Sequence, residues 1–164
     1  MAPASPPGLD SVDRALLAAL RTNGRASYAE LARLVGLSAP SVQDRVKRLE
    51  DRGFVAGYAA IVVPRAIGLG VTALVGISQG EGADQEDVAR RLRDVEAIED
   101  CWLVAGEESF VAKVRVADVA ALEHTLAVLQ RIRGVARTRT TVVLSTRWEG
   151  RTPPPPLPDV AAAP

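Results

Sequence analysis

In the first third of the chain, hydrophobic residues recur every three or four positions, which is the spacing of one face of a helix. This pattern predicts a helix that opens at Asp10 and leaves through the turn Asn23-Gly24-Arg25. A second helix is expected from Ser27, because Ser27 and Glu30 form the sequence of a capping box, and Gly36 can end it. The predicted inward residues of the two helices are Val12, Leu16, Leu17, Leu20, Leu31, Leu34 and Val35.

A third helix follows the second after only a few residues. Ser38 can cap its start, its first turn tolerates Pro40, and it is expected to end at Gly53. Its apolar residues Val42, Val46 and Leu49 are spaced i, i+4 and i+7. Two helices joined by so short a turn form a helix-turn-helix, in which the second helix can enter the major groove of DNA.

The polar side of this third helix is the predicted reading face. At about 100° per residue, its polar residues point away from the apolar stripe. Near the N-terminus, Ser41 and Gln43 are placed to touch base edges, whereas the later cations can reach phosphates or guanine. Asp44 would accept from a cytosine amine or orient an arginine. The predicted DNA-binding residues are Arg25, Ser38, Ser41, Gln43, Asp44, Arg45, Lys47 and Arg48. The alternative is an ordinary solvated helix, since acidic residues dilute its charge.

The second half of the chain changes to a pattern of strands and helices. Val71 to Ser78 reads as a strand, although its continuous apolar run also fits a buried helix. Further strands are predicted at 98–105, 110–116 and 135–144. Helices are predicted at 83–94 and after Asp118, the latter with Val119, Leu122, Leu126 and Leu129 inward. The order strand, helix, strand, strand, helix, strand predicts an antiparallel sheet with both helices on one face. Its other face would be apolar, and a second subunit is the simplest cover.

These patterns divide the chain into an α+β protein of two domains. The helix-turn-helix domain spans 9–53, an extended hinge strand 54–66, and the sheet domain 67–148. Residues 1–8 and the Pro/Ala-rich tail 149–164 are expected to be disordered. The net charge is zero, with eight cationic against six acidic residues (+2) before residue 64, which neither requires nor excludes nucleic acid. With no apolar run near 18 residues, we expect a cytoplasmic protein without a membrane partner.

Catalysis is the competing class of function. Cys101 and His124 are the only cysteine and histidine, and both acyl transfer and metal binding need more partners than one of each. We therefore expect no catalytic residues, no metal site and no cofactor, and the competing hypothesis is a small enzyme of this fold. Trp102 and Trp148 are expected to pack as apolar anchors.

The order and spacing of several short motifs resemble the leucine-responsive/AsnC (Lrp/AsnC, feast/famine) transcription regulators across residues 9–148. The motifs are Leu9-Asp10 with Asp13, Gly24-Arg25, Glu30-Leu31-Ala32, Gly36-Leu37-Ser38, Arg45-Val46-Lys47-Arg48-Leu49-Glu50, Gly53, Gly57-Tyr58, Gly106, Gly134-Val135 and Thr138-Arg139-Thr140. The resemblance implies a winged-helix-like helix-turn-helix domain and a ferredoxin-like βαββαβ domain. It also implies double-stranded DNA as partner, a homodimer that often stacks into octamers, and amino-acid effectors bound in clefts between dimers.

The resemblance further implies an effector cleft made by one turn and the last strand. The corresponding residues are Gly106, Glu107, Glu108, Ser109, Thr138 and Thr140. The family usually has aspartates and an aromatic residue after its glycine, so this chain departs from it there. Backbone groups near Gly106 would hold an effector's α-carboxylate, and a glutamate its ammonium. Two alternatives are a solvated hairpin turn without ligand and a DNA-organising protein that senses nothing.

Overall fold

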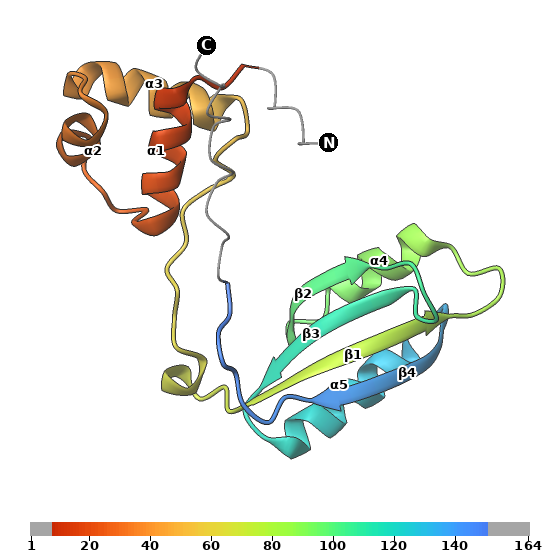
Figure 1. Ribbon diagram of the computed structural model, residues 1–164. Coiled ribbons are helices and arrows are strands. Elements are labelled where there is room, and N and C mark those ends of the chain that lie inside the picture. The colour runs from red at the N-terminus through yellow and green to blue at the C-terminus, as the bar shows by residue number, and fades with distance from the viewer. Residues whose placement is uncertain (1–7, 151–164) are drawn as a thin grey trace, which may run out of the picture. The chain divides into compact units, whose positions relative to one another are not determined.

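The computed structural model describes residues 8–150, which form two compact units with their sequence boundary between Ile61 and Val62 (Figure 1). The predicted N-terminal segment, apart from Gly8, and the predicted tail from residue 151 onward lie outside the described residues. Glu149 and Gly150, which we expected in the tail, are described, and Glu149 belongs with the second unit.

Three helices build the first unit: α1 (Ser11–Thr22), α2 (Tyr28–Val35) and α3 (Ala39–Asp51). The predicted caps are confirmed. The side chains of Asp10 and Ser27 accept from the backbone N–H three residues later, and both form complete capping boxes. Ser38 caps α3 in the same way, and Gly36 ends α2 with φ +69°. The turn between α2 and α3 is therefore as short as a helix-turn-helix requires.

The core of the first unit lies where the three helices meet. Its buried hydrophobic residues are Leu16, Leu31, Ala32, Val42, Val46 and Leu49. Leu34 was predicted to point inward, but it is exposed. The reason is that α2 turns Leu31, Ala32 and Val35 toward the core, and Leu34 lies about 100° away from the centre of that face.

The segment after α3 is not the strand that its composition predicted. Phe54 and Val55 pack against the core of the first unit, and the backbone then runs without a ladder partner to a short 3₁₀ helix, η1 (Pro64–Ile67). A strand needs a neighbour to bond with, and among the described residues no strand pairs with this segment. Apolar composition alone therefore overstated its regular structure.

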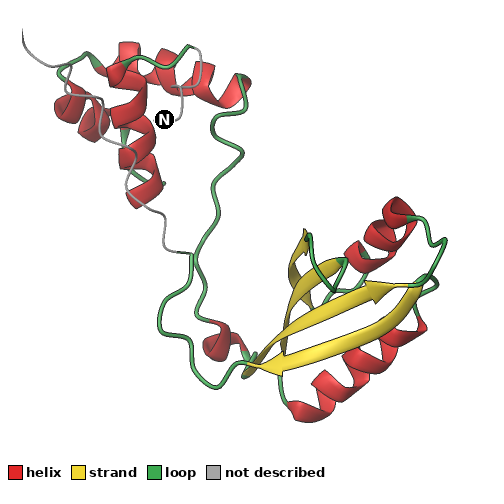
Figure 2. Cartoon of the chain, turned by 45° about the vertical axis from the view of Figure 1, so that its right-hand side comes forward, coloured by secondary structure: helices red, strands yellow, loops and turns green. Residues whose placement is uncertain are grey.

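The second unit is a four-stranded antiparallel sheet with the strand order β2-β3-β1-β4, and it confirms the predicted α+β fold (Figures 1 and 2). Its elements are β1 (Val71–Gln79), α4 (Gln85–Arg93), β2 (Ile98–Leu103), β3 (Phe110–Val116), α5 (Val119–Arg131) and β4 (Val135–Val142). The continuous apolar run from Val71 is thus a strand, at the centre of the sheet.

Alternate residues of β1 and β3 pack against both helices on one face of the sheet (Figure 2). The buried residues are Ala73, Val75, Ile77, Phe110, Ala112, Val114 and Val116 from the strands, with Val88, Leu92, Leu122 and Leu129 from the helices. Val119 is exposed in the first turn of α5, contrary to prediction. Gly134, at φ +94°, comes so close to α4 that a Cβ there would lie 2.6 Å from Val88 Cγ2.

The opposite face of the sheet, which we call the open face, is only partly apolar. The register puts Leu74, Gly76 and Val111 on it beside Trp102. Charged side chains from the same face flank this strip: Lys113, Arg115, Arg137 and Arg139. The open face is therefore apolar, as expected, only in the strip between these charged side chains. Trp102 and Trp148 are 48% and 73% exposed in the single chain, so neither packs as an apolar anchor within it.

Candidate functional sites

The outer side of α3 carries most of the predicted DNA-binding residues. Val42, Val46 and Leu49 are buried, so the helix shows its polar side to solvent. Ser41, Gln43, Asp44, Lys47 and Arg48 are all exposed there. Ser38 lies at the start, where its Oγ accepts from the Ser41 backbone N–H and lies 2.8 Å from Ser41 Oγ. The structure thus groups these residues on one helical face, whereas Arg25 is exposed in the turn before α2.

Arg45 differs from its neighbours, because its guanidinium is bound within the first unit. Its Nη1 lies 2.6 Å from Asp10 Oδ2 and 2.8 Å from Asp13 Oδ1, at the start of α1. The backbone N–H of Asp13 and then this arginine lower the pKa of Asp10. The pair joins α3 to α1 across more than thirty residues of sequence. Sequence spacing gave no signal for it.

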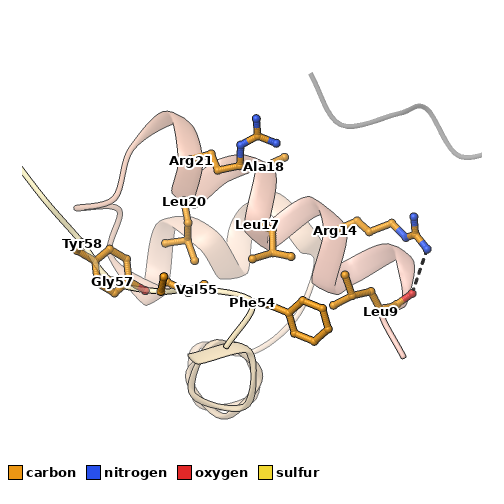
Figure 3. Close-up of a pocket in the computed structure, with 11 residues that line it drawn as sticks. Leu9, Arg14, Leu17, Ala18, Leu20, Arg21, Phe54, Val55, Gly57 and Tyr58 are labelled. Carbon is orange, nitrogen blue, oxygen red and sulfur yellow. Dashed lines mark hydrogen bonds between the residues drawn. The ribbon is translucent and has the colours of Figure 1, made fainter. Parts of the chain in front are cut away.

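A groove of about 500 Å³ lies between α1 and the segment that follows α3. Figure 3 shows Phe54, Val55 and Tyr58 beside Leu17 and Leu20 of α1. Tyr58 donates to Glu50 Oε1 at 2.7 Å, and burial together with this bond raises the pKa of Tyr58 to about 12. The tyrosine therefore stays protonated at neutral pH and ties the end of α3 to the outgoing chain.

The turn between β2 and β3 is bound to β4 by ion pairs on the open face. Glu107 lies 2.6 Å from Arg137 and 3.6 Å from Arg139, and Glu108 pairs with Arg139. Arg137, followed by Arg139, lowers the pKa of Glu107. Glu108 can lie flat here because Gly76 has no side chain, and a Cβ at Gly76 would be 2.7 Å from Glu108 Cγ.

The two threonines expected beside this turn are on the other side of the sheet. In the ladder Thr138 is opposite Ile77 and Thr140 opposite Val75, both of which point into the helix-covered core. Thr138 Oγ1 accepts a hydrogen bond from Gln130 Nε2 of α5 at 3.1 Å. Since side chains alternate along a strand, Arg137 and Arg139 are the β4 residues that meet Glu107 and Glu108. Within the chain, therefore, the arginines of β4 and not the two predicted threonines lie beside the turn.

Two further residues complete the inner side of the turn. Ser109 donates its backbone N–H to Ile77 O at 2.9 Å, and its Oγ accepts from the Gln79 N–H at 3.3 Å. The side-chain Nε2 of Gln79 is buried and has no hydrogen-bond partner within the described range 8–150. Sequence reasoning missed Gln79, Arg137 and Arg139, and only the register against β1 could have found them.

The described residues show no arrangement typical of a metal centre. Cys101 on β2 is exposed as a residue, although partial burial raises the pKa of its thiol, and His124 is exposed on α5. No group of three or more His, Cys, Asp or Glu in residues 8–150 is placed to hold a metal ion. Over the same range, none of the helices combines the length and apolar character needed to span a bilayer.

Comparison with known proteins matches both units to described domains. Residues 9–50 match the AsnC-type helix-turn-helix domain, and residues 71–153 match the Lrp/AsnC ligand binding domain. The chain belongs to the Lrp/AsnC family. Similar curated proteins include the HTH-type transcriptional regulator LrpA of Mycobacterium tuberculosis, 46% identical over 87% of this chain and 95% of LrpA. The leucine-responsive regulatory protein of Escherichia coli K12 is 37% identical over 83% of this chain and 85% of its own.

Solved structures of the family share the fold. Leucine response regulatory protein LrpA of M. tuberculosis has a TM-score of 0.81 at 43% identity, covering 90% of this chain and 100% of its own. The M. tuberculosis feast or famine regulatory protein complexed with L-methionine has a TM-score of 0.85 at 43% identity and the same coverage. An L-Met complex of a Neisseria meningitidis transcriptional regulator has a TM-score of 0.82 at 31% identity, covering 87% and 94%. This Lrp/AsnC chain is accordingly a transcriptional regulator with a helix-turn-helix and a ligand-binding domain.

Proposed function

We propose that the regulator binds duplex DNA as a homodimer through the outer face of α3. Gln43 and Ser41 read base edges near the start of the helix, while Lys47 and Arg48 contact phosphates. Support comes from their common exposure on one helical face, opposite the buried side of α3. Arg45 has a different role in this proposal: it sets the position of α3 through Asp10 and Asp13.

Two further predicted contacts fit around this face. We assign Arg25, in the turn before α2, to a phosphate, and Asp44 to a cytosine amine or to the orientation of a neighbouring cation. Ser38 contributes as the cap of α3, since its Oγ already accepts from the Ser41 N–H. The positions nearest the helix start therefore specify sequence, and the cations behind them supply affinity.

The test is duplex binding measured against salt concentration. Replacing either Lys47 or Arg48 by Ala should weaken binding to all sequences and lower the slope of log K against log salt by about 0.9, which is the release of one counterion. Gln43→Ala should instead change the preferred sequence, at about 1–3 kcal/mol for a lost base contact. Arg133→Ala removes one exposed charge from the second unit and is the matched control. Normal duplex binding by the Gln43, Lys47 and Arg48 triple alanine variant would refute the assignment.

We propose that an amino acid binds at the turn Gly106–Ser109, with Arg137 and Arg139 in place of the threonines. An amino acid carries one carboxylate and one ammonium, and this turn places two arginines beside Glu107 and Glu108. Gln79, whose backbone N–H donates to Ser109 in this turn, also carries a buried Nε2 without a hydrogen-bond partner among residues 8–150. Two relatives of known structure are L-methionine complexes, which supports this class of ligand.

A thermal-shift screen of the twenty amino acids tests the effector. By mass action, a ligand at a hundredfold excess over its Kd stabilises the protein by about 2.7 kcal/mol. Gly76→Ala should abolish the shift, because the new Cβ displaces Glu108, whereas Gly82→Ala meets open space and serves as the control glycine. If no amino acid shifts the wild type, the non-sensing DNA-organising function replaces this one. A shift that survives in Glu107→Gln/Arg137→Gln would refute binding at this turn.

We propose that the open face forms the homodimer interface, and that dimers can stack into octamers. Leu74 and Trp102 are exposed on this face, and Trp102 is opposite Val111 in the ladder. Sedimentation of the full chain at tens of micromolar, roughly the range that resolves ordinary homodimers, should show at least a dimer. Leu74→Asp should give a monomer. Val119→Asp changes an exposed residue of α5 away from this face and should leave the dimer intact. A monomeric wild type would refute the interface.

A further inference from the structure

Lys113 and Arg115 lie side by side on the open face, in the half of β3 away from the Gly106–Ser109 turn. The side chains of Lys113 and Arg115 are only 14% and 8% exposed. Neighbouring cations repel each other, so such burial requires compensating charge. Three carboxylates provide it: Glu99 and Asp100 from β2, and Glu149 from the segment after β4.

Glu149 is held as a bound carboxylate would be. Lys113 Nζ donates to its Oε1 at 2.5 Å, and Arg115 Nη2 lies 2.9 Å from Oε1 and 2.8 Å from Oε2. Bonds from Lys113 and then Arg115 lower the pKa of Glu149. Burial disfavours the charged form of Lys113, but the bonds to Asp100, Glu149 and Glu99 outweigh it and raise the pKa of that ammonium.

Glu149 lies on a segment that has left the sheet. The N–H of Val143 donates to Thr72 O at 2.9 Å as the last ladder bond, and the chain then leaves the sheet. Leu144 and Trp148 are exposed on the way. Beside Glu149 lies a cavity of about 370 Å³, whose lining includes Leu69, Thr72, Arg115, Val143 and Leu144. A small molecule that replaced the Glu149 carboxylate would thus find space next to it.

We propose that Lys113 and Arg115 form a binding site for a small carboxylate, which Glu149 occupies until a free ligand displaces it. Without Glu149 the cluster keeps two cations and two carboxylates, and both β3 cations retain donors aimed at the vacated position. Glu99 and Asp100 accept from Lys113 at 3.0 and 2.6 Å and are partly exposed, so they can also accept from an ammonium on the same ligand. This site is separate from the proposed effector site and does not depend on it.

The covalent link sets the concentration range of the exchange. A tethered group competes at an effective concentration of the order of millimolar, so a free carboxylate must reach at least that level to displace Glu149 from the wild type. Removing the Glu149 carboxylate removes this competitor. The Glu149→Ala variant should therefore bind the same ligand at lower concentration than the wild type does.

Chemical rescue of Glu149→Ala tests the site in the full chain. We expect the variant to melt below the wild type, and sodium acetate to restore the melting temperature saturably, whereas sodium chloride at equal ionic strength does not. Glu123→Ala removes an exposed α5 carboxylate from the same unit and should show no acetate-specific response. The double variant Glu149→Ala/Arg115→Gln should also fail to respond. An equal response to acetate and chloride, or rescue that persists in the double variant, would overturn the proposal.

Displacement in the presence of Glu149 has its own reporter, because Trp148 is the adjacent residue. In a Trp102→Phe background Trp148 is the only tryptophan, and its fluorescence anisotropy should fall as acetate or glycine releases the segment. Glycine should act at lower concentration than acetate if Glu99 and Asp100 accept its ammonium. Constant anisotropy up to molar acetate would contradict displacement. The same change in Glu107→Gln/Arg137→Gln would show that the ligand acts here and not at the Gly106–Ser109 turn.

Discussion

Replacement of Arg45 by Met separates a structural role from a DNA contact. Arg45→Met keeps most of the apolar stem of the side chain and removes the guanidinium that lies between Asp10 and Asp13. We expect the variant to lose stability in the first unit and to keep the charge dependence of its DNA binding. Replacing a residue that contacts a phosphate would instead lower the salt dependence of DNA binding.

The size of the stability loss follows from burial. The Asp13 side chain is 12% exposed and Arg45 25%, so the pair is more buried than a surface ion pair, which contributes about 0–1 kcal/mol. Breaking a fully buried pair costs about 3–5 kcal/mol, because one charge is left without a partner. Asp10 is half exposed and can return to water. An intermediate loss of about 2 kcal/mol is therefore expected, which for a domain of this size lowers Tm by roughly 8 °C or more.

A double-mutant cycle with Asp13→Asn measures the interaction itself. The two changes together should cost about 1 kcal/mol less than the sum of the single changes, since each removes the same contact. In DNA titrations, Arg45→Met should leave the slope of log K against log salt unchanged, while Lys47→Met lowers it by about 0.9. Additive stability effects, or a slope for Arg45→Met that falls as it does for Lys47→Met, would refute the structural role.

Two further predictions concern the second unit. Because its pKa is lowered in the folded protein, Glu149 stabilises fully above its unfolded pKa of about 4.3, and this contribution disappears as the pH falls through the lower folded value. The Tm difference between wild type and Glu149→Ala should thus be constant from pH 7 to about pH 5.5 and shrink once the pH falls below the unfolded pKa of about 4.3; a difference that grows in acid would contradict this sign. Gly134→Ala combines a strained φ with a clash against buried Val88, and urea unfolding should show a loss of about 2–4 kcal/mol in the free energy of unfolding. Gly82→Ala, where φ is also positive but space is open, should lose about 1 kcal/mol. Equal losses for the two glycines would remove the role of the contact.

The features that the sequence predicted well depend on nearby residues. Each cap at Asp10, Ser27 and Ser38 involves a backbone N–H three residues later, so a short window contains the whole interaction. The strand and helix order of the second unit follows from local periodicity in the same way. These elements were sufficient to identify both the fold and the helix-turn-helix.

The sequence was least informative where a partner is distant along the chain. The position of Arg45 on α3 indicated an unpaired side chain, and only the packing of α1 brings Asp13 to it. Alternation along β4 divides Thr138 from Arg139, but which of them meets the turn depends on the register with β1. The apolar segment after α3 likewise lacks a strand partner within the described chain. Tertiary pairing decides each of these cases.

Each unit has a hydrophobic core of its own, with no buried residue shared between the two sets. Mutations that reshape one core or its surface therefore leave the packing of the other unchanged, and their effects on folding should combine independently. For a lineage of regulators, this separation lets operator preference and ligand preference diversify at different rates after gene duplication. For an engineer, it makes the boundary between Ile61 and Val62 a natural junction for chimaeras that join a new reading helix to an existing sensor.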